Sequence, residues 1–202
     1  MTVLAWIGTT VAGLTLGMTV STTLLGAGGR PLSPVLAGLV LVALFGAVIG
    51  AILGLVQLIA IRSVPWRMWI AATALGSAAG FTGAALVGEQ VANVISPTTN
   101  IVLGGAAIQI SAGAMAGLGI GSMQWLVLSR PLDVSRWWIA ASAVGAGLGY
   151  ASAAGVLELL EVPVLKAALI PSFGAIVGLF TGAAQGLTLW RVRPGLTRPA
   201  PQ

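Results

Sequence analysis

Hydrophobic residues occur along this chain in six long runs, separated by short segments rich in glycine and proline. A transmembrane helix needs about 20 apolar residues to cross a hydrocarbon core about 30 Å thick. Six stretches meet this requirement: residues 3–26, 35–61, 66–88, 101–129, 137–157 and 166–190. The pattern therefore predicts an all-α polytopic membrane protein with six transmembrane helices in a single membrane domain, residues 1–202.

The ends and breaks of these runs carry further signals. The first run has no basic segment before it and no small-residue cleavage site after it, so we expect it to be a retained helix. Pro171 lies inside the sixth run, and that helix is expected either to begin late or to kink. The basic, proline-rich residues 194–202 are expected to form a disordered tail.

The even-numbered runs share a pattern of three glycines, a glutamine and an arginine, G-x3-G-x3-G-x2-Q followed by Arg five or six residues later. Its copies are Gly46, Gly50, Gly54, Gln57 and Arg62; Gly113, Gly117, Gly121, Gln124 and Arg130; and Gly174, Gly178, Gly182, Gln185 and Arg191. At about 100° per residue, the three glycines and the glutamine fall on one narrow stripe of a helix.

The odd-numbered runs share a second pattern, W-I-x5-G-x3-G. Its copies are Trp6, Ile7, Gly13 and Gly17; Trp69, Ile70, Gly76 and Gly80; and Trp138, Ile139, Gly145 and Gly149. The tryptophan and both glycines again share one helix face. Glycine lowers the stability of an isolated helix, so aligned glycines indicate close contact between neighbouring helices. We therefore predict glycine-lined seams, a glycine zipper, throughout the bundle.

The two patterns alternate, so the chain reads as three copies of one helical hairpin, with units at about residues 1–64, 65–132 and 133–193. Each unit contains two spans, and all three units consequently enter the membrane in the same direction. A pseudo-threefold bundle is the simplest closed arrangement of three such units. An open row of hairpins is the alternative.

The composition agrees with a lipid environment and excludes several kinds of metal and catalytic site. Only 6% of the residues are charged, whereas a soluble domain carries roughly 25%. Cysteine and histidine are both absent, which removes thiolate or imidazole metal sites and Ser–His or Cys–His nucleophiles. We expect no metal, no cofactor and no enzymatic activity.

The charges also predict an orientation. Seven arginines fall on the side that both termini share: Arg62, Arg67, Arg130, Arg136, Arg191, Arg193 and Arg198. The positive-inside rule places that side, and both termini, in the cytoplasm, as expected for a multi-pass protein of a bacterial inner membrane. This placement explains the net charge of +5 without nucleic-acid binding.

The arginines and tryptophans near this boundary are candidate interface anchors. Arg62, Arg130 and Arg191 are expected to extend their charged ends to the headgroups, although an anionic lipid or solute site is the alternative. All seven tryptophans are expected near the same boundary, where an indole can hydrogen-bond at the headgroups: Trp6, Trp66, Trp69, Trp125, Trp137, Trp138 and Trp190. Trp6, Trp69 and Trp138 are the anchors that belong to the repeat.

The three repeated glutamines are the main candidate site. A closed bundle would bring Gln57, Gln124 and Gln185 together as a polar ring, which would be either a selectivity constriction or a set of interhelical hydrogen bonds. The sequence favours the hydrogen bonds. Gln109 lies deeper on the same stripe and is also interpreted as structural.

Two acidic residues occupy equivalent positions, Glu89 and Glu158, each nine residues after a repeat glycine. An acid within a span is a functional candidate by default. These two lie at the outer ends of their helices, however, and solvated helix ends are the better interpretation.

The segment 121–149, with its "QWLVLSR" and "RWWIAAS" elements, resembles bacterial multi-spanning membrane proteins that carry a repeated G-x2-Q, Arg, Trp-Ile hairpin. No activity is established for that group, so the resemblance implies a fold only. We expect a non-enzymatic structural or accessory subunit, with the lipid bilayer and other membrane subunits as partners. The alternative is a small-solute channel or carrier with a glutamine-lined constriction.

Overall fold

A computed structural model describes residues 2–26, 34–61, 64–95, 101–132, 134–159 and 163–192. Within these ranges the protein has six α-helices and no strand: α1 (Val3–Gly26), α2 (Pro34–Gln57), α3 (Trp66–Ile95), α4 (Ile101–Leu132), α5 (Trp137–Leu159) and α6 (Pro163–Val192). All six are long and apolar enough to cross a membrane. For the described residues, the prediction of an all-α protein with six helices long and apolar enough to span a membrane is confirmed. The predicted tail, 194–202, lies outside the described residues.

Most helix ends lie within a few residues of the predicted runs, and three boundaries have a visible cause. α2 ends at Gln57, and a tighter turn follows in which Ala60 N donates to Gln57 O over 2.9 Å. α3 extends to Ile95 because no proline interrupts it before Pro97. α6 does not begin late: it starts at Pro163, a residue suited to the first helical position, and runs past Pro171.

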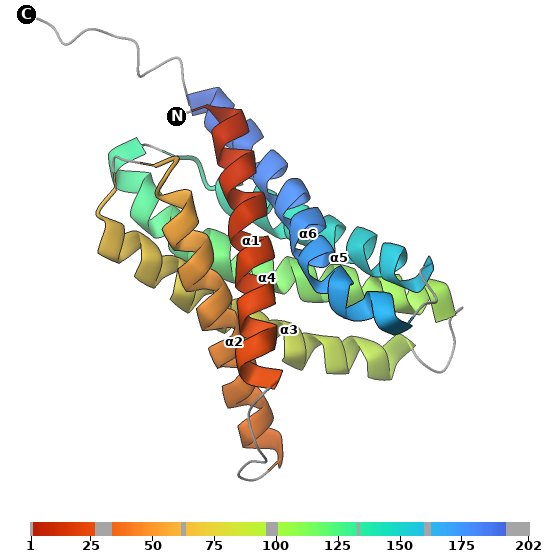
Figure 1. The fold of residues 1–202 in the computed structure, drawn as a ribbon. Coiled ribbons are helices and arrows are strands. Elements are labelled where there is room, and N and C mark those ends of the chain that lie inside the picture. Colours follow the sequence, from red (N-terminus) through yellow and green to blue (C-terminus); the bar gives the residue numbers. More distant parts are fainter. Residues whose placement is uncertain are drawn as a thin grey trace, which may run out of the picture.

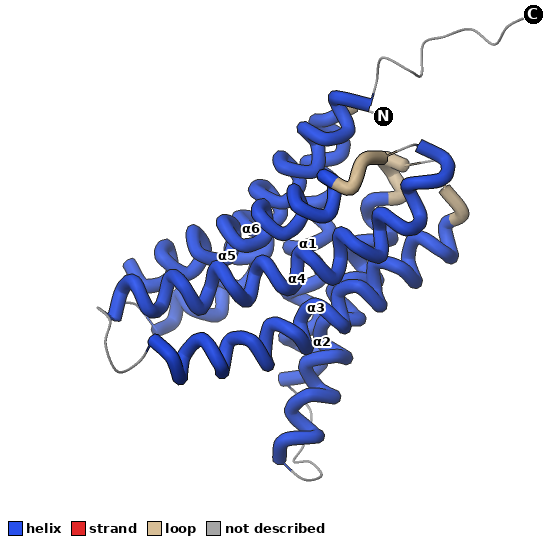
Figure 2. The backbone as a smooth tube through the Cα atoms, turned by 180° about the vertical axis from the view of Figure 1, so that it is seen from behind, coloured by secondary structure: helices blue, strands red, loops and turns tan. Residues whose placement is uncertain are grey.

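The helices contact one another in chain order, and α6 returns to contact α1 (Figure 1). α1 begins and α6 ends at the same end of the bundle, which we call the terminal end (Figure 1). Away from it, α2 and α3 diverge, as both views show (Figures 1 and 2). The contacts therefore run once around a common interior.

Glycines lie wherever these helices approach most closely. A Cβ atom added at Gly13 of α1 would lie 2.9 Å from Leu53 Cα of α2. One added at Gly46 of α2 would lie 2.7 Å from Ser77 O of α3. Both distances are shorter than real Cβ contacts, so an alanine would force the helices apart.

The remaining repeat glycines also lie against a neighbouring helix, with Cβ positions 3.2 Å or less from its nearest atom. Each odd helix turns its glycines to the next even helix, and each even helix turns its glycines to the next odd helix, with α6 facing α1. At this last seam, a Cβ atom at Gly178 would lie 2.6 Å from Val11 Cα. All fifteen repeat glycines contact a neighbouring helix: Gly13, Gly17, Gly46, Gly50, Gly54, Gly76, Gly80, Gly113, Gly117, Gly121, Gly145, Gly149, Gly174, Gly178 and Gly182.

Two apolar clusters fill the interior. The cluster at the terminal end contains three tryptophans with Ile61, Leu128 and Leu189. The second cluster, farther along the helices, includes Leu14, Ile49, Leu53, Ile120 and Val177. The outward surface carries exposed leucines and valines, as lipid contact requires.

Candidate functional site: a buried glutamine layer

Between the two apolar clusters lies a polar layer built from three glutamines. Gln57, Gln124 and Gln185 are each at most 1% exposed. Gln124 Nε2 donates to Gln57 Oε1 over 3.0 Å, and Gln185 Nε2 donates to Gln124 Oε1 over 3.2 Å. The structure therefore brings the three predicted residues together, although their α-helices are far apart in sequence.

Each glutamine also donates to a hydroxyl group on the preceding odd helix. Gln57 Nε2 donates to Thr10 Oγ1 (3.1 Å) and Gln124 Nε2 to Thr73 Oγ1 (3.4 Å). Gln185 Nε2 donates to Ser142 Oγ (2.7 Å). All three hydroxyl residues are fully buried. They help satisfy side-chain amides that would be unfavourable in a membrane interior without partners.

These hydroxyl residues were not singled out from the sequence, although a signal for them exists. Each lies four residues after a repeat tryptophan, so the full odd-helix pattern is W-I-x2-[S/T]-x2-G-x3-G. Residues four apart lie on the same helix face. The hydroxyl therefore shares the inward face of its tryptophan, one turn deeper. Specifying the third of the five residues between Ile and the first glycine would have found the partners of the glutamines.

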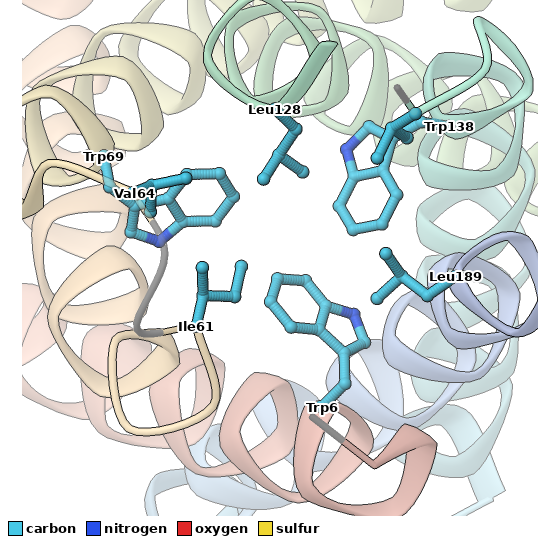
Figure 3. Packing of buried hydrophobic residues seen from close by; sticks show 8 residues of the cluster. Trp6, Ile61, Val64, Trp69, Leu128, Trp138 and Leu189 are labelled. Carbon is cyan, nitrogen blue, oxygen red and sulfur yellow. The ribbon is translucent and has the colours of Figure 1, made fainter. Parts of the chain in front are cut away.

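The tryptophans of the repeat cover this layer. Trp6, Trp69 and Trp138 are fully buried, and their side chains converge on one centre (Figure 3). The Trp6 ring lies 6.2 Å from that of Trp69 and 5.3 Å from that of Trp138, both edge to face. The expectation that these residues anchor the helices at the headgroups is therefore wrong, because a ring with no exposed surface cannot contact lipid.

Other tryptophans do face outward at the terminal end. Trp66, Trp137 and Trp190 are 57%, 70% and 64% exposed. The Arg67 guanidinium lies 5.1 Å from the centre of the Trp66 ring. Trp125 is partly buried and donates through Nε1 to Val134 O over 2.9 Å. The tryptophans that are exposed at this end therefore lie outside the repeat pattern.

The indole N–H groups join the polar layer unequally. Trp6 Nε1 donates to Gln185 Oε1 over 3.2 Å, whereas Trp69 Nε1 and Trp138 Nε1 are buried without a hydrogen-bond partner. The amide oxygen of each glutamine has two acceptor sites. The Gln57 and Gln124 oxygens accept from the next glutamine, and each retains a site that an indole could use.

The other candidate residues lie elsewhere. Gln109 is half-buried on α4 and does not belong to the glutamine layer. The side chains of Glu89 and Glu158 lie outside the described part of the structure. The same holds for the side chains of Arg62, Arg130 and Arg191, so their anchoring role stays a prediction.

Two cavities lie on the far side of the layer from the tryptophans. The larger has a volume of about 400 Å³ and is lined by Met18, Thr22, Phe45, Phe81, Tyr150, Ile170 and Phe173. The smaller has a volume of about 20 Å³. Its wall includes Thr10, Ser142 and Gln185 from the polar layer, and Met18, Phe81 and Tyr150, which it shares with the larger cavity.

The aromatic residues of the larger cavity were also missed. Phe45 and Phe173 immediately precede repeat glycines, and Phe81 and Tyr150 immediately follow them. Their rings form edge contacts, with centroids 5.7 Å apart for Phe45 and Phe81 and 5.1 Å apart for Tyr150 and Phe173. Their common position next to a repeat glycine can be seen in the sequence.

Comparison of the chain with protein-family models, with curated proteins and with solved structures finds no match in any of the three.

Proposed function

We propose that this protein is a non-enzymatic structural or accessory subunit of a membrane assembly. One observation carries the proposal: the three glutamines hydrogen-bond to one another in series and to Thr10, Thr73 and Ser142, beneath three tryptophans in edge-to-face contact. A polar layer whose amide groups are engaged in bonds between helices stabilises helix contacts and offers little to a passing solute. Contact with a partner subunit is then made by the outward-facing surface.

The proposed architecture is a pseudo-threefold bundle of three repeated hairpins with a glycine zipper at every seam. Two series of contacts support it. Each glutamine bonds to the hydroxyl residue of the preceding odd helix, and each row of repeat glycines faces the next helix. Equivalent residues making equivalent contacts three times is what a common rotation would produce.

We place the terminal end of the bundle at the cytoplasmic face of the plasma membrane of a bacterium. Arg67 and Arg136 are exposed at that end, each beside a tryptophan ring. Basic residues favour the cytoplasmic side, and tryptophans favour the interface. A cysteine placed at position 67 should react with a membrane-impermeant maleimide only after the cells are opened.

The test of the accessory function is extraction of the full chain in a mild detergent, followed by mass spectrometry of what purifies with it. A partner present at a fixed ratio through two further separations, and lost when an exposed outer leucine such as Leu75 or Leu179 is changed to tryptophan, is the expected result. Purification as a lone monomer contradicts the proposal.

A small-solute channel or carrier is the second candidate, and the cavity of about 400 Å³ beyond the glutamine layer is the observation that favours it. Liposomes that contain the protein decide between the two. The structural proposal predicts background flux of ions and of small neutral solutes. A flux that disappears when all three glutamines are changed to leucine, with folding retained, would establish the channel instead.

A further inference from the structure

We infer that the cavity of about 400 Å³ holds one acyl chain of a membrane phospholipid. The inference goes beyond the structural function proposed above. It rests on three observations: a wall of four aromatic rings in mutual contact, a mainly apolar lining at membrane depth, and one position of the repeat where α4 has a small residue in place of a large one.

Four aromatic rings, one each from α2, α3, α5 and α6, form a wall of the cavity. Phe45 contacts Phe81, Phe81 contacts Tyr150, and Tyr150 contacts Phe173. Their ring centroids lie 5.7, 6.4 and 5.1 Å apart in that order. Because each ring packs against its neighbour, the wall is formed before any ligand enters, as is usual for small-molecule sites.

The cavity is open to its surroundings at membrane depth. The four rings pack against the second apolar cluster and yet stay partly exposed, so the cavity can be reached from outside the bundle. Each ring belongs to a helix segment apolar enough to cross a membrane. Phe45 lies 12 residues before Gln57 in α2, or about 18 Å along the helix. The surroundings at this depth are acyl chains.

The lining favours a hydrocarbon. No charged side chain lines the cavity, and its residues are apolar except for Thr22 and Tyr150. The Thr22 hydroxyl is already engaged, because it donates to Met18 O over 2.6 Å. A charged group would lose its hydration there without gaining a partner, and apolar cavities stay free of water. An acyl chain has no hydration to lose and gains contacts with the packed rings.

The volume matches a single chain. An apolar cavity of about 150 Å³ holds one benzene molecule. In proportion, the cavity of about 400 Å³ accommodates roughly 16 carbon atoms. One acyl chain of a phospholipid has this size, whereas two chains with their headgroup exceed it. The second chain and the headgroup therefore stay in the bilayer outside the cavity.

One position of the repeat accounts for the space. The residue before the first glycine of each even helix is Phe45 in α2 and Phe173 in α6, and both line the cavity. In α4 the corresponding residue is Ala112. A third ring at this register would occupy volume that the alanine leaves free. Two copies of the repeat therefore build the wall, and the other copy leaves space for a chain.

Native mass spectrometry of the full chain tests the inference. Protein extracted from membranes and washed through repeated detergent exchange is expected to retain one phospholipid per chain. Ala112→Phe should lower the retained fraction by about tenfold, because the added ring excludes methylene groups from the cavity. Ala79→Phe is the matched control: Ala79 is exposed on α3, two residues before Phe81, and a ring there should leave retention unchanged.

Photolabelling in lipid nanodiscs locates the chain and identifies its source. One probe is a phospholipid with a diazirine in one acyl chain, and the other is the matched free alkane. The phospholipid probe should label Phe81 and Phe173 more strongly than Leu75, which is 64% exposed and reports contact with bulk lipid. The excess should disappear in Ala112→Phe.

Four results would overturn the inference. They are loss of all phospholipid from the washed wild type, equal retention by Ala112→Phe and the wild type, labelling of Phe81 and Phe173 no stronger than that of Leu75, and labelling of the cavity by the free alkane alone. The last result would assign the cavity to a free apolar molecule. The wild-type labelling decides the matter even where Ala112→Phe fails to fold. None of these results bears on the accessory function.

Discussion

Trp6 and Gln185 are joined by a hydrogen bond of 3.2 Å between the indole Nε1 and the amide Oε1, across 179 positions of the sequence. The bond connects the first helix to the last and lies beside a glycine seam formed by Gly174, Gly178 and Gly182. One polar contact and one row of small residues therefore act together where the chain returns to its beginning.

The glutamine layer should behave as a unit. Gln124 takes part in three hydrogen bonds, so Gln124→Leu should lower the free energy of unfolding by about 2–5 kcal/mol, given about 0.6–1.7 kcal/mol per bond within a membrane. Changing all three glutamines to leucine should cost less than the sum of the three single changes, because fewer buried groups are left unpaired. Reversible unfolding in bicelles measures both quantities. If the triple variant loses as much unfolding free energy as the three single variants together, the three glutamines do not form one network.

Seam glycines should respond to alanine in the opposite sense to exposed ones. Gly178→Ala should destabilise the protein by about 1–3 kcal/mol, since its Cβ atom would overlap Val11. Gly8→Ala is the matched control: no atom lies within 4 Å of its Cβ position, and alanine favours the helix by up to about 1 kcal/mol. Thermal unfolding of the two variants gives the comparison. Similar melting temperatures would argue against close packing at the α1–α6 seam.

The tryptophans should separate into two groups by contact with lipid. Brominated acyl chains quench only indoles that they touch. A variant with Trp66, Trp137 and Trp190 changed to phenylalanine keeps the three buried rings, and its emission should be almost insensitive to brominated lipid. The reciprocal variant, lacking Trp6, Trp69 and Trp138, should be strongly quenched if it folds. Trp125 is present in both. Strong quenching of the first variant would contradict a buried cluster.

Helix number and approximate extent could be predicted from the sequence because a bilayer imposes a minimum apolar length on each span. The repeat also predicted which residues meet: the same 3.6-residue periodicity that aligned the glycines placed each glutamine on the inward stripe. These predictions needed only the length of each apolar run and the geometry of a single helix, both of which can be read from the sequence.

The tryptophan prediction failed for an instructive reason. Hydropathy and position near a helix end are the same for Trp69, which is buried, and Trp66, which is exposed. Only the helix face distinguishes them. Trp69 shares the face of Gly76 and Gly80, and this face decides its burial over the general preference of indoles for interfaces.

The cavities could not have been predicted from the pattern. Their volume depends on how far Phe45, Phe81, Tyr150 and Phe173 fill the space between diverging helices, and that depends on crossing angles. The lack of a hydrogen-bond partner for the buried Thr181 hydroxyl is likewise a property of the packed state.

Closure between the first and last helices is the central claim, and an engineered disulfide tests it most directly because the chain has no cysteine of its own. The Cβ position of Gly186 lies 3.9 Å from Val3 Cβ, within the range of about 3.5–4.5 Å that a disulfide requires. The Val3→Cys, Gly186→Cys pair should form an intramolecular bond on mild oxidation in native membranes, detected as a linked peptide by mass spectrometry. The Gly8→Cys, Gly186→Cys pair should not, because no atom lies within 4 Å of the Cβ position of Gly8. Free thiols in the first pair after oxidation would contradict the closed arrangement and favour an open row of hairpins.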